Sequence, residues 1–191
     1  PAEEDFRKEC ADWLNAEMAG EFRDIKGITK LTASPERRKE WEQRLGEAKW
    51  GCIGWPSAWG GRDATLAQQV IFAEEYARAG VPGRVNHIGI ELAGPTILAF
   101  GTEEQKQRFL PRIAAGRTIF CQGFSEPGAG SDLASVRTKG RLEGGEWVVD
   151  GQKVWASRAL ASHRSRLLTR TDPSAPKHRG LTYFIIDMDQ P

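Results

Sequence analysis

Apolar residues recur at every third or fourth position through the first part of the chain. Five residues keep this spacing between Glu3 and Met18: Phe6, Cys10, Trp13, Leu14 and Met18. A helix of 3.6 residues per turn places such positions on one side and leaves the polar residues on the other. The pattern predicts an amphipathic helix over 3–18 that packs its apolar side against neighbouring helices.

Start and stop signals predict two helices after the first. Ser34 followed by Pro35 indicates an N-cap and a first helical position, for a helix that runs to about Lys49. The third helix of the chain is expected over 66–79, and Gly80 is a plausible C-terminal cap for it.

A fourth helix is predicted from the run Thr102-Glu103-Glu104-Gln105, which has the form of a capping box. This helix is expected to stop near Gly116. Pro111 lies inside the pattern and lacks a backbone N–H, so we expect a kink or a late break there.

The pattern changes from helical to alternating at about Arg117. Short strands are predicted over 118–124, 136–143, 146–150, 152–157, 165–171 and 181–187, with turns at Gly144-Gly145 and Asp150-Gly151. A block of helices followed by a block of strands indicates the α+β class. We therefore expect an all-helical domain over 1–116, followed by a small, β-barrel-like antiparallel domain over 117–191.

Composition narrows the class of partner and compartment. The chain has 27 basic and 26 acidic residues and no dense basic run, which argues against nucleic acid as a partner. It contains no apolar stretch long enough for a membrane span and no charged-then-apolar leader. Three widely spaced cysteines argue against a disulfide framework or a metal site, and a cytoplasmic location is expected.

The chemically richest segment is the turn Gly123–Ser135, which follows the strand-like stretch 118–122. Its glycines let a backbone approach a ligand closely or adopt positive φ, and successive turn amides can point at an anion. Ser125 and Ser131 add hydroxyl groups that donate and accept. The segment predicts a cradle for a phosphate or for the polar edge of a planar ring, the alternative being an ordinary Gly/Pro-rich turn.

A dinucleotide-binding fingerprint of the Rossmann type does not fit this turn. That fingerprint needs a third glycine three positions after the second. Counted from Gly128 and Gly130, the position holds Leu133, and no βαβ pattern follows.

A second segment, Asp150–Ser157, reads as a hairpin turn leading into a strand. On that strand Trp155 and Ser157 would project from the same face. An aromatic side chain beside a hydroxyl suits a flat heteroaromatic ligand, although Trp155 taken alone would more often be a core residue, as aromatic strand residues usually are. Glu126, inside the first turn, is interpreted as an acceptor of backbone amides and not as a catalyst.

Together, the two segments resemble the acyl-CoA dehydrogenase family. Gly123–Ser135 is similar to the first signature of that family, and Gly151–Ser157 to its Gly-x-Lys-x-Trp-x-Ser/Thr segment. Upstream landmarks agree: Gly54-Trp55-Pro56 with Gly60-Gly61, Gly94-Pro95-Thr96, Phe100-Gly101-Thr102 and Gln105–Pro111. The resemblance covers essentially the whole chain and implies an FAD-dependent enzyme that oxidises the Cα–Cβ bond of an acyl-CoA thioester, with α-proton abstraction and hydride transfer to flavin N5.

The resemblance also implies site residues. The implied cofactor-binding residues are Gln122, Gly123, Phe124, Ser125, Gly130, Ser131, Trp155, Ala156 and Ser157. Ser125 would bond the pyrimidine side of the flavin, Trp155 would flank the ring, and Ser157 would reach N5. Ser131 would also bind substrate. Ser125 and Ser157 stand where many relatives have threonine, and Gln122 replaces an aromatic or aliphatic residue.

The resemblance implies no catalytic residue within this chain. The family's base is a carboxylate in a C-terminal helical domain, and nothing here matches it, so we expect a fragment or one half of a split enzyme. Implied partners are an acyl-CoA substrate, an electron-transferring flavoprotein as acceptor, and a homo- or hetero-oligomer. Two alternatives remain: a non-catalytic or split-enzyme flavin-binding subunit, and a relative that uses oxygen, such as an acyl-CoA oxidase or a flavin monooxygenase.

Overall fold

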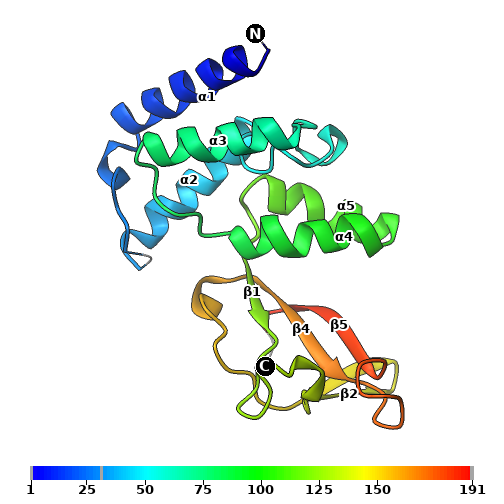
Figure 1. The fold of residues 1–191 in the computed structure, drawn as a ribbon. Coiled ribbons are helices and arrows are strands. Elements are labelled where there is room, and N and C mark those ends of the chain that lie inside the picture. The colour runs from blue at the N-terminus through cyan, green and yellow to red at the C-terminus, as the bar shows by residue number, and fades with distance from the viewer. Residues whose placement is uncertain (1, 31, 190–191) are drawn as a thin grey trace. The chain divides into compact units, whose positions relative to one another are not determined.

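The computed structural model describes residues 2–30 and 32–189 of the 191-residue chain (Figure 1). The chain divides into two compact units, Pro1–Arg117 and Thr118–Pro191. The first contains only helices and is called the helical unit; the second carries every strand of the described residues and is called the sheet unit. The expected α+β class is confirmed.

The helical unit contains α1 (Ala2–Ala19), α2 (Pro35–Glu47), α3 (Leu66–Arg78), α4 (Gly94–Phe100) and α5 (Glu103–Ala114), with short 3-10 turns η1 (Arg23–Ile25) and η2 (Ser57–Trp59). Helices α1, α2, α3 and α5 form where the periodicity and end signals predict them. Helix α4 and the 3-10 turns were not predicted, nor was the π-helix over Ile88–Ala93 (η3), which leads directly into α4. Helix α5 runs past Pro111 to Ala114 without interruption.

The helix starts show which cap signals act as predicted. The capping box of α5 is confirmed, since the Gln105 amide donates to Thr102 Oγ1 at 3.2 Å and the Thr102 amide to Gln105 Oε1 at 2.9 Å. Thr65 and Gln68 form the same box on α3. The side-chain cap expected from Ser34 is wrong: this residue adopts a left-handed conformation (φ 48°, ψ 54°) and makes no cap hydrogen bond. A capping side chain needs an extended backbone at that position.

The core of the helical unit is rich in aromatic rings. The predicted face of α1 is buried at Phe6, Cys10, Leu14 and Met18. Around it pack Trp41, Trp50 and Phe72, the last two stacked with ring centroids 5.4 Å apart. Burying one such side chain stabilises a fold by about 1.5–3 kcal/mol. This packing makes the unit a rigid frame for its polar interior.

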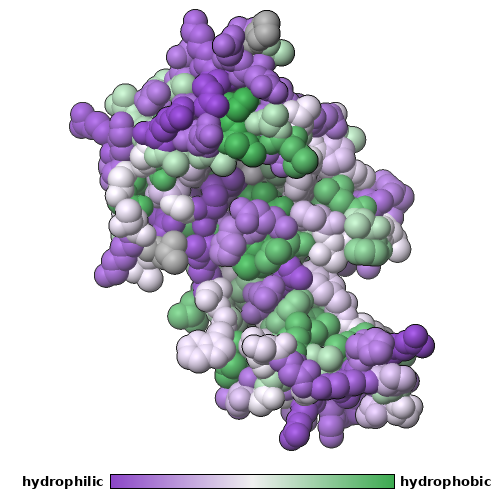
Figure 2. All heavy atoms as spheres, viewed as in Figure 1, coloured by the Kyte–Doolittle hydropathy of each residue, from purple (hydrophilic) through white to green (hydrophobic). Residues whose placement is uncertain are grey.

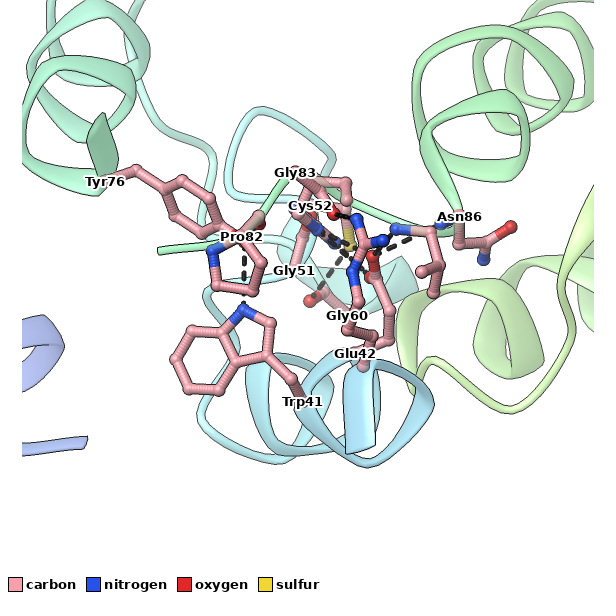
Figure 3. A network of polar contacts seen from close by, with 12 residues as sticks. Trp41, Glu42, Gly51, Cys52, Gly60, Tyr76, Pro82, Gly83 and Asn86 are labelled. Carbon is pink, nitrogen blue, oxygen red and sulfur yellow. Dashed lines mark hydrogen bonds and ion pairs between the residues drawn. The ribbon is translucent and has the colours of Figure 1, made fainter. Parts of the chain in front are cut away.

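That polar interior is centred on a buried ion pair between Glu42 and Arg84, shown in part in Figure 3. The Glu42 carboxylate accepts from Arg84 Nε at 3.0 Å and Nη2 at 2.7 Å, and from the Val85 and Asn86 amides at 2.7 and 3.2 Å. Arg84 Nη1 donates to the Gly51 carbonyl at 3.0 Å. These bonds fix segment 84–86, from which η3 starts.

The sheet unit is a five-stranded mixed sheet, so the prediction of a purely antiparallel arrangement is corrected. Its strands are β1 (Phe120–Gly123), β2 (Lys139–Glu143), β3 (Glu146–Asp150), β4 (Arg164–Arg170) and β5 (Leu181–Asp187). β4 pairs in parallel with β1 and, at its end, with β2, and antiparallel with β5. β2 and β3 form an antiparallel hairpin through Gly144-Gly145, both with positive φ, as the two-residue turn requires.

The segment 152–157 is not a strand, and Asp150-Gly151 is not a hairpin turn. At Gly151 the chain runs close against Thr138, where an added Cβ would lie 2.5 Å from Thr138 Oγ1. Instead the Val154 amide donates to the Ser125 carbonyl at 2.9 Å, and Trp155 adopts a left-handed conformation with φ 57°. A long-range contact with the Gly123–Ser135 turn therefore replaces the local hairpin.

Candidate functional site

The predicted turn begins where β1 ends, at Gly123. Glu126 and Ala129 exchange two backbone hydrogen bonds, of 2.9 and 3.1 Å, around Pro127 and Gly128. A Cβ on Gly128 or Gly130 would meet nothing within 4 Å, and neither glycine has positive φ. Their value is therefore the open space beside the backbone and not an unusual conformation, which corrects one of the two reasons given for the glycines.

Glu126 holds this turn in place, as interpreted from the sequence. Its carboxylate accepts from the Arg137 and Thr138 amides at 2.7 and 2.9 Å and from Lys153 Nζ at 2.8 Å. Burial alone would raise the pKa of Glu126, but the bonds from Lys153, Thr138 and Arg137 outweigh it and lower the pKa to about 2. The carboxylate is thus a fixed anion and is ill suited to proton transfer near neutral pH.

Lys153 joins the two predicted segments, a role that sequence reasoning missed. Its ammonium group donates to Glu126 and, at 3.0 Å, to the Phe124 carbonyl, while the next amide, of Val154, bonds Ser125. The lysine side chain is only 11% exposed. The available signal was the position of Lys153 in the Gly-x-Lys-x-Trp-x-Ser segment, between the polar run 150–152 and the apolar run 154–156.

Trp155 lies on the surface, which excludes the interpretation that it is a core residue. Its exposed fraction is 88%, and Leu160 nearby is also fully exposed. The expectation that Trp155 and Ser157 share a strand face is wrong, because the left-handed backbone at Trp155 forms a tight turn in which the Ser157 amide donates to the Trp155 carbonyl at 2.8 Å. A bulky residue in this conformation is strained, and such strain gathers at functional sites.

The hydroxyl-bearing residues around this turn are open to a ligand. Ser125 is half-buried, and Ser131 and Ser157 are exposed. In the described part of the chain, none of these three hydroxyls has a hydrogen-bond partner. The turn therefore offers three free donors beside open glycines, and Ala156 lies half-buried between the Trp155 and Ser157 positions.

Gln122 and Phe124 bring a third group of residues to the site. Gln122 is the register partner of Arg166 on β4, so their side chains share one face of the sheet. The Phe124 ring lies 4.7 Å from the Arg166 guanidinium and meets the Tyr183 ring edge-on at 6.3 Å. Burial lowers the pKa of Arg166 and raises that of Tyr183.

Each unit also has a cavity that lies away from this site. One of about 620 Å³ belongs to the helical unit and is lined by aromatic and apolar residues, including Trp50, Trp55 and Phe72, together with Arg84. A smaller one of about 480 Å³ belongs to the sheet unit and is lined by Arg137, Lys139, Arg141 and Arg170. Neither contains a predicted site residue. On the face drawn in Figure 2, apolar residues are exposed on both units.

The described residues offer neither a cluster of metal ligands nor a membrane-spanning helix. Within 2–30 and 32–189, no group of three or more His, Cys, Asp or Glu side chains is placed to hold a metal ion. Among those same residues, no helix has the length and hydropathy needed to cross a membrane.

Comparison with known proteins identifies both units. The profile described as "Acyl-CoA dehydrogenase, N-terminal domain" matches residues 1–117, and "Acyl-CoA dehydrogenase, middle domain" matches residues 121–191. The chain is 49% identical over 191 residues to acyl-CoA dehydrogenase IpdE1 of Mycobacterium tuberculosis, covering 98% of this chain and 50% of that protein.

Solved structures agree with these matches. The ChsE4-ChsE5 complex from Mycobacterium tuberculosis superposes with a TM-score of 0.84 at 39% identity, covering 99% of this chain and 47% of that one. The Tcur3481-Tcur3483 steroid ACAD gives 0.84 at 36% identity, with 98% and 48% covered. The chain thus spans about half the length of these relatives. It belongs to the acyl-CoA dehydrogenase family, whose members depend on FAD.

Proposed function

We propose that the protein containing this chain is an FAD-dependent acyl-CoA dehydrogenase that oxidises the Cα–Cβ bond of an acyl-CoA thioester. Family membership supports the reaction class. The observation that carries the assignment to this site is the Lys153 bridge, which holds the segments around Ser125 and Trp155 together. Since the chain spans half of its relatives, the activity is proposed for the whole protein.

The residues of the sheet unit fit an FAD cofactor. Gly128 and Gly130 leave room beside the backbone, and the free hydroxyls of Ser125, Ser131 and Ser157 can donate to phosphate or ring oxygen and nitrogen atoms. The indole of Trp155 is free to cover a flat ring. When bound, FAD would supply the acceptor for the hydride that leaves Cβ.

The chain's own residues would bind and orient the reactants. We propose that Gln122, Gly123, Phe124 and Ser125 present main-chain and hydroxyl groups along the ring, and that Ser131 also contacts the substrate. Trp155, Ala156 and Ser157 would line the other edge. Glu126 and Lys153 would act as positioning residues, because their buried ion pair fixes both segments and leaves neither group free to move a proton.

The base that abstracts the α-proton is proposed to lie outside these residues. Glu126, a carboxylate within the turn, is held ionised by three hydrogen bonds and is unsuited to the task. Electron-transferring flavoprotein is proposed as the acceptor. A relative solved as the ChsE4-ChsE5 complex favours a second candidate, in which this chain belongs to one subunit of a hetero-oligomer.

The assignment is tested by Trp155→Ala in the complete native protein. Losing an aromatic contact is expected to weaken FAD binding about 3- to 10-fold and to shift the flavin absorption spectrum. Flavin content and spectrum are measured after gel filtration and on titration with FAD. Leu160→Ala, at an equally exposed apolar position nearby, is the matched control and should change neither. Wild-type stoichiometry and spectrum in the Trp155 variant would count against the proposed site.

A further inference from the structure

One face of the sheet unit carries polar side chains that lack partners. Arg166 Nε, Arg166 Nη1 and Tyr183 Oη are buried and have no hydrogen-bond partner in the structure. Gln122 is the register partner of Arg166, and among the described residues its side-chain amide has no hydrogen bond either. Tyr183 pairs with Leu168, two residues along β4 from Arg166, and the centroid of its ring lies 5.3 Å from the Arg166 guanidinium carbon. Three hydrogen-bonding groups therefore gather at one place.

The other arginines of β4 show that this is an exception. Arg170 donates from all three guanidinium nitrogens, to the carbonyls of Val136, Lys177 and Ala134. Arg164 pairs with Asp187 at 3.0 Å. Arg164, Arg166 and Arg170 are separated by even numbers of residues along β4, so their side chains lie on the same face of the sheet. Arg164 and Arg170 thus have polar partners, whereas Arg166 contacts the faces of Phe124 and Tyr183.

Aromatic faces attract a cation but accept its N–H groups far more weakly than oxygen atoms do. A buried charge without hydrogen bonds is costly to keep, and methionine at such a position is often tolerated as well or better. Arg166 Nη2 is not among the buried unpaired atoms, so this nitrogen reaches the surface while the other two are enclosed. The guanidinium group is therefore enclosed at Nε and Nη1 and accessible to solvent at Nη2.

We propose that Arg166, with Tyr183 and Gln122, recognises an oxyanion of a small-molecule ligand seated on this face of β1, β4 and β5. The exposed Nη2 of Arg166 can donate to one oxygen atom of a carboxylate or a phosphate, and the half-buried side-chain amide of Gln122 can donate to another; a small shift of the two rings would add Arg166 Nη1 and Tyr183 Oη, which are enclosed without the ligand. The ligand class rests on the function proposed above, and two sources supply this chemistry: a second carboxylate on the acyl group, or a phosphate of FAD or CoA. Arg166 is then a specificity-determining residue.

The test compares adipyl-CoA with hexanoyl-CoA, which differ by the terminal carboxylate, as ligands of the complete native protein. Dissociation constants for both esters, for free CoA and for FAD are measured in wild type, Arg166→Met and Arg166→Lys. Arg164→Met is the matched control, since it removes an arginine that already has a partner. Melting temperatures without ligand are recorded for all variants.

If the oxyanion is a substrate carboxylate, wild type prefers adipyl-CoA by about 10- to 100-fold, and Arg166→Met abolishes the preference. If it is a nucleotide phosphate, the variant binds FAD or CoA weaker by a similar factor, with both esters affected equally or not at all. Arg166→Lys falls between, and Arg164→Met matches wild type. In either case the unliganded Arg166→Met protein melts no lower than wild type.

Unchanged affinities for all four ligands would overturn the inference. So would a melting temperature of Arg166→Met well below that of wild type with the ligand preferences retained, because the arginine would then be a brace for the two rings. The proposed function fails separately, if wild type holds FAD but oxidises no acyl-CoA ester. Arg166-dependent binding of adipyl-CoA or of a nucleotide would survive that result.

Discussion

Arg84 in the helical unit and Arg166 in the sheet unit both carry largely enclosed guanidinium groups, and the surroundings of these two groups differ. Arg84 meets a carboxylate, and each of its three guanidinium nitrogens has an acceptor on Glu42 or Gly51. Arg166 meets two aromatic rings and leaves two buried nitrogens without an acceptor. A buried cation that is fully paired serves the fold; one that is left unpaired needs another reason to be kept.

The same difference appears in the carboxylates. Burial would raise the pKa of Glu42, but Arg84 and the amides of Asn86 and Val85 hold it below its usual value. Glu126 is held down in the same way by Lys153 and two amides. Each of these anions fixes a backbone segment, 84–86 in one unit and the Gly123–Ser135 turn in the other. The sheet unit therefore has its own fully paired ion pair, directly beside the unpaired Arg166 face.

The sharpest test of this comparison makes one substitution at both arginines. Arg84→Met leaves Glu42 buried without its counter-ion and is expected to cost about 3–5 kcal/mol in the free energy of unfolding. Arg166→Met is expected to leave the free energy of unfolding unchanged or to raise it by about 1 kcal/mol, since no hydrogen bond is lost and methionine also packs against the two rings. Urea unfolding of both variants gives the numbers. Equal losses at the two positions would remove the distinction between them.

The second test concerns Glu126→Gln, which should destabilise by about 2–3 kcal/mol because Lys153 loses its counter-ion. The folded-state pKa of Glu126 is depressed from 4.5 to about 2. Its stabilising effect is therefore present above pH 4.5 and is lost as the pH falls from 4.5 towards 2. Unfolding free energies measured across this window should converge for wild type and variant at its acid end. A constant gap down to pH 2 would contradict the pairing.

The smallest effect is expected for Trp155→Ala, whose side chain is 88% exposed. Its free energy of unfolding should change by less than about 0.5 kcal/mol, as for other surface substitutions. The test uses chemical denaturation followed by circular dichroism, since five of the seven tryptophans lie in the helical unit and would mask a fluorescence signal from this one. A large loss would mean that Trp155 supports the fold and is not kept for a ligand.

Local signals in the sequence were sufficient wherever the contacts are local. The spacing of Phe6, Cys10 and Leu14 predicted the buried side of α1, and the run from Thr102 to Gln105 predicted the start of α5. Strand β5 and the Gly144-Gly145 turn also formed as expected. In each case the residues that decide the structure lie within one or two turns of each other.

The sequence by itself determined α1, α2, α3 and α5, the five strands, the α+β class and the family, and it located both segments of the candidate site; it missed α4 and wrongly predicted a strand over 152–157. Only the tertiary structure decided that β1 pairs in parallel with β4, more than forty residues away, and that Val154 bonds Ser125 in place of a hairpin partner. It alone showed that Lys153 is the link and that Arg166 has no acceptor. The physical reason is that pairing and hydrogen-bond satisfaction depend on distant residues brought together by folding, which no local period or cap records.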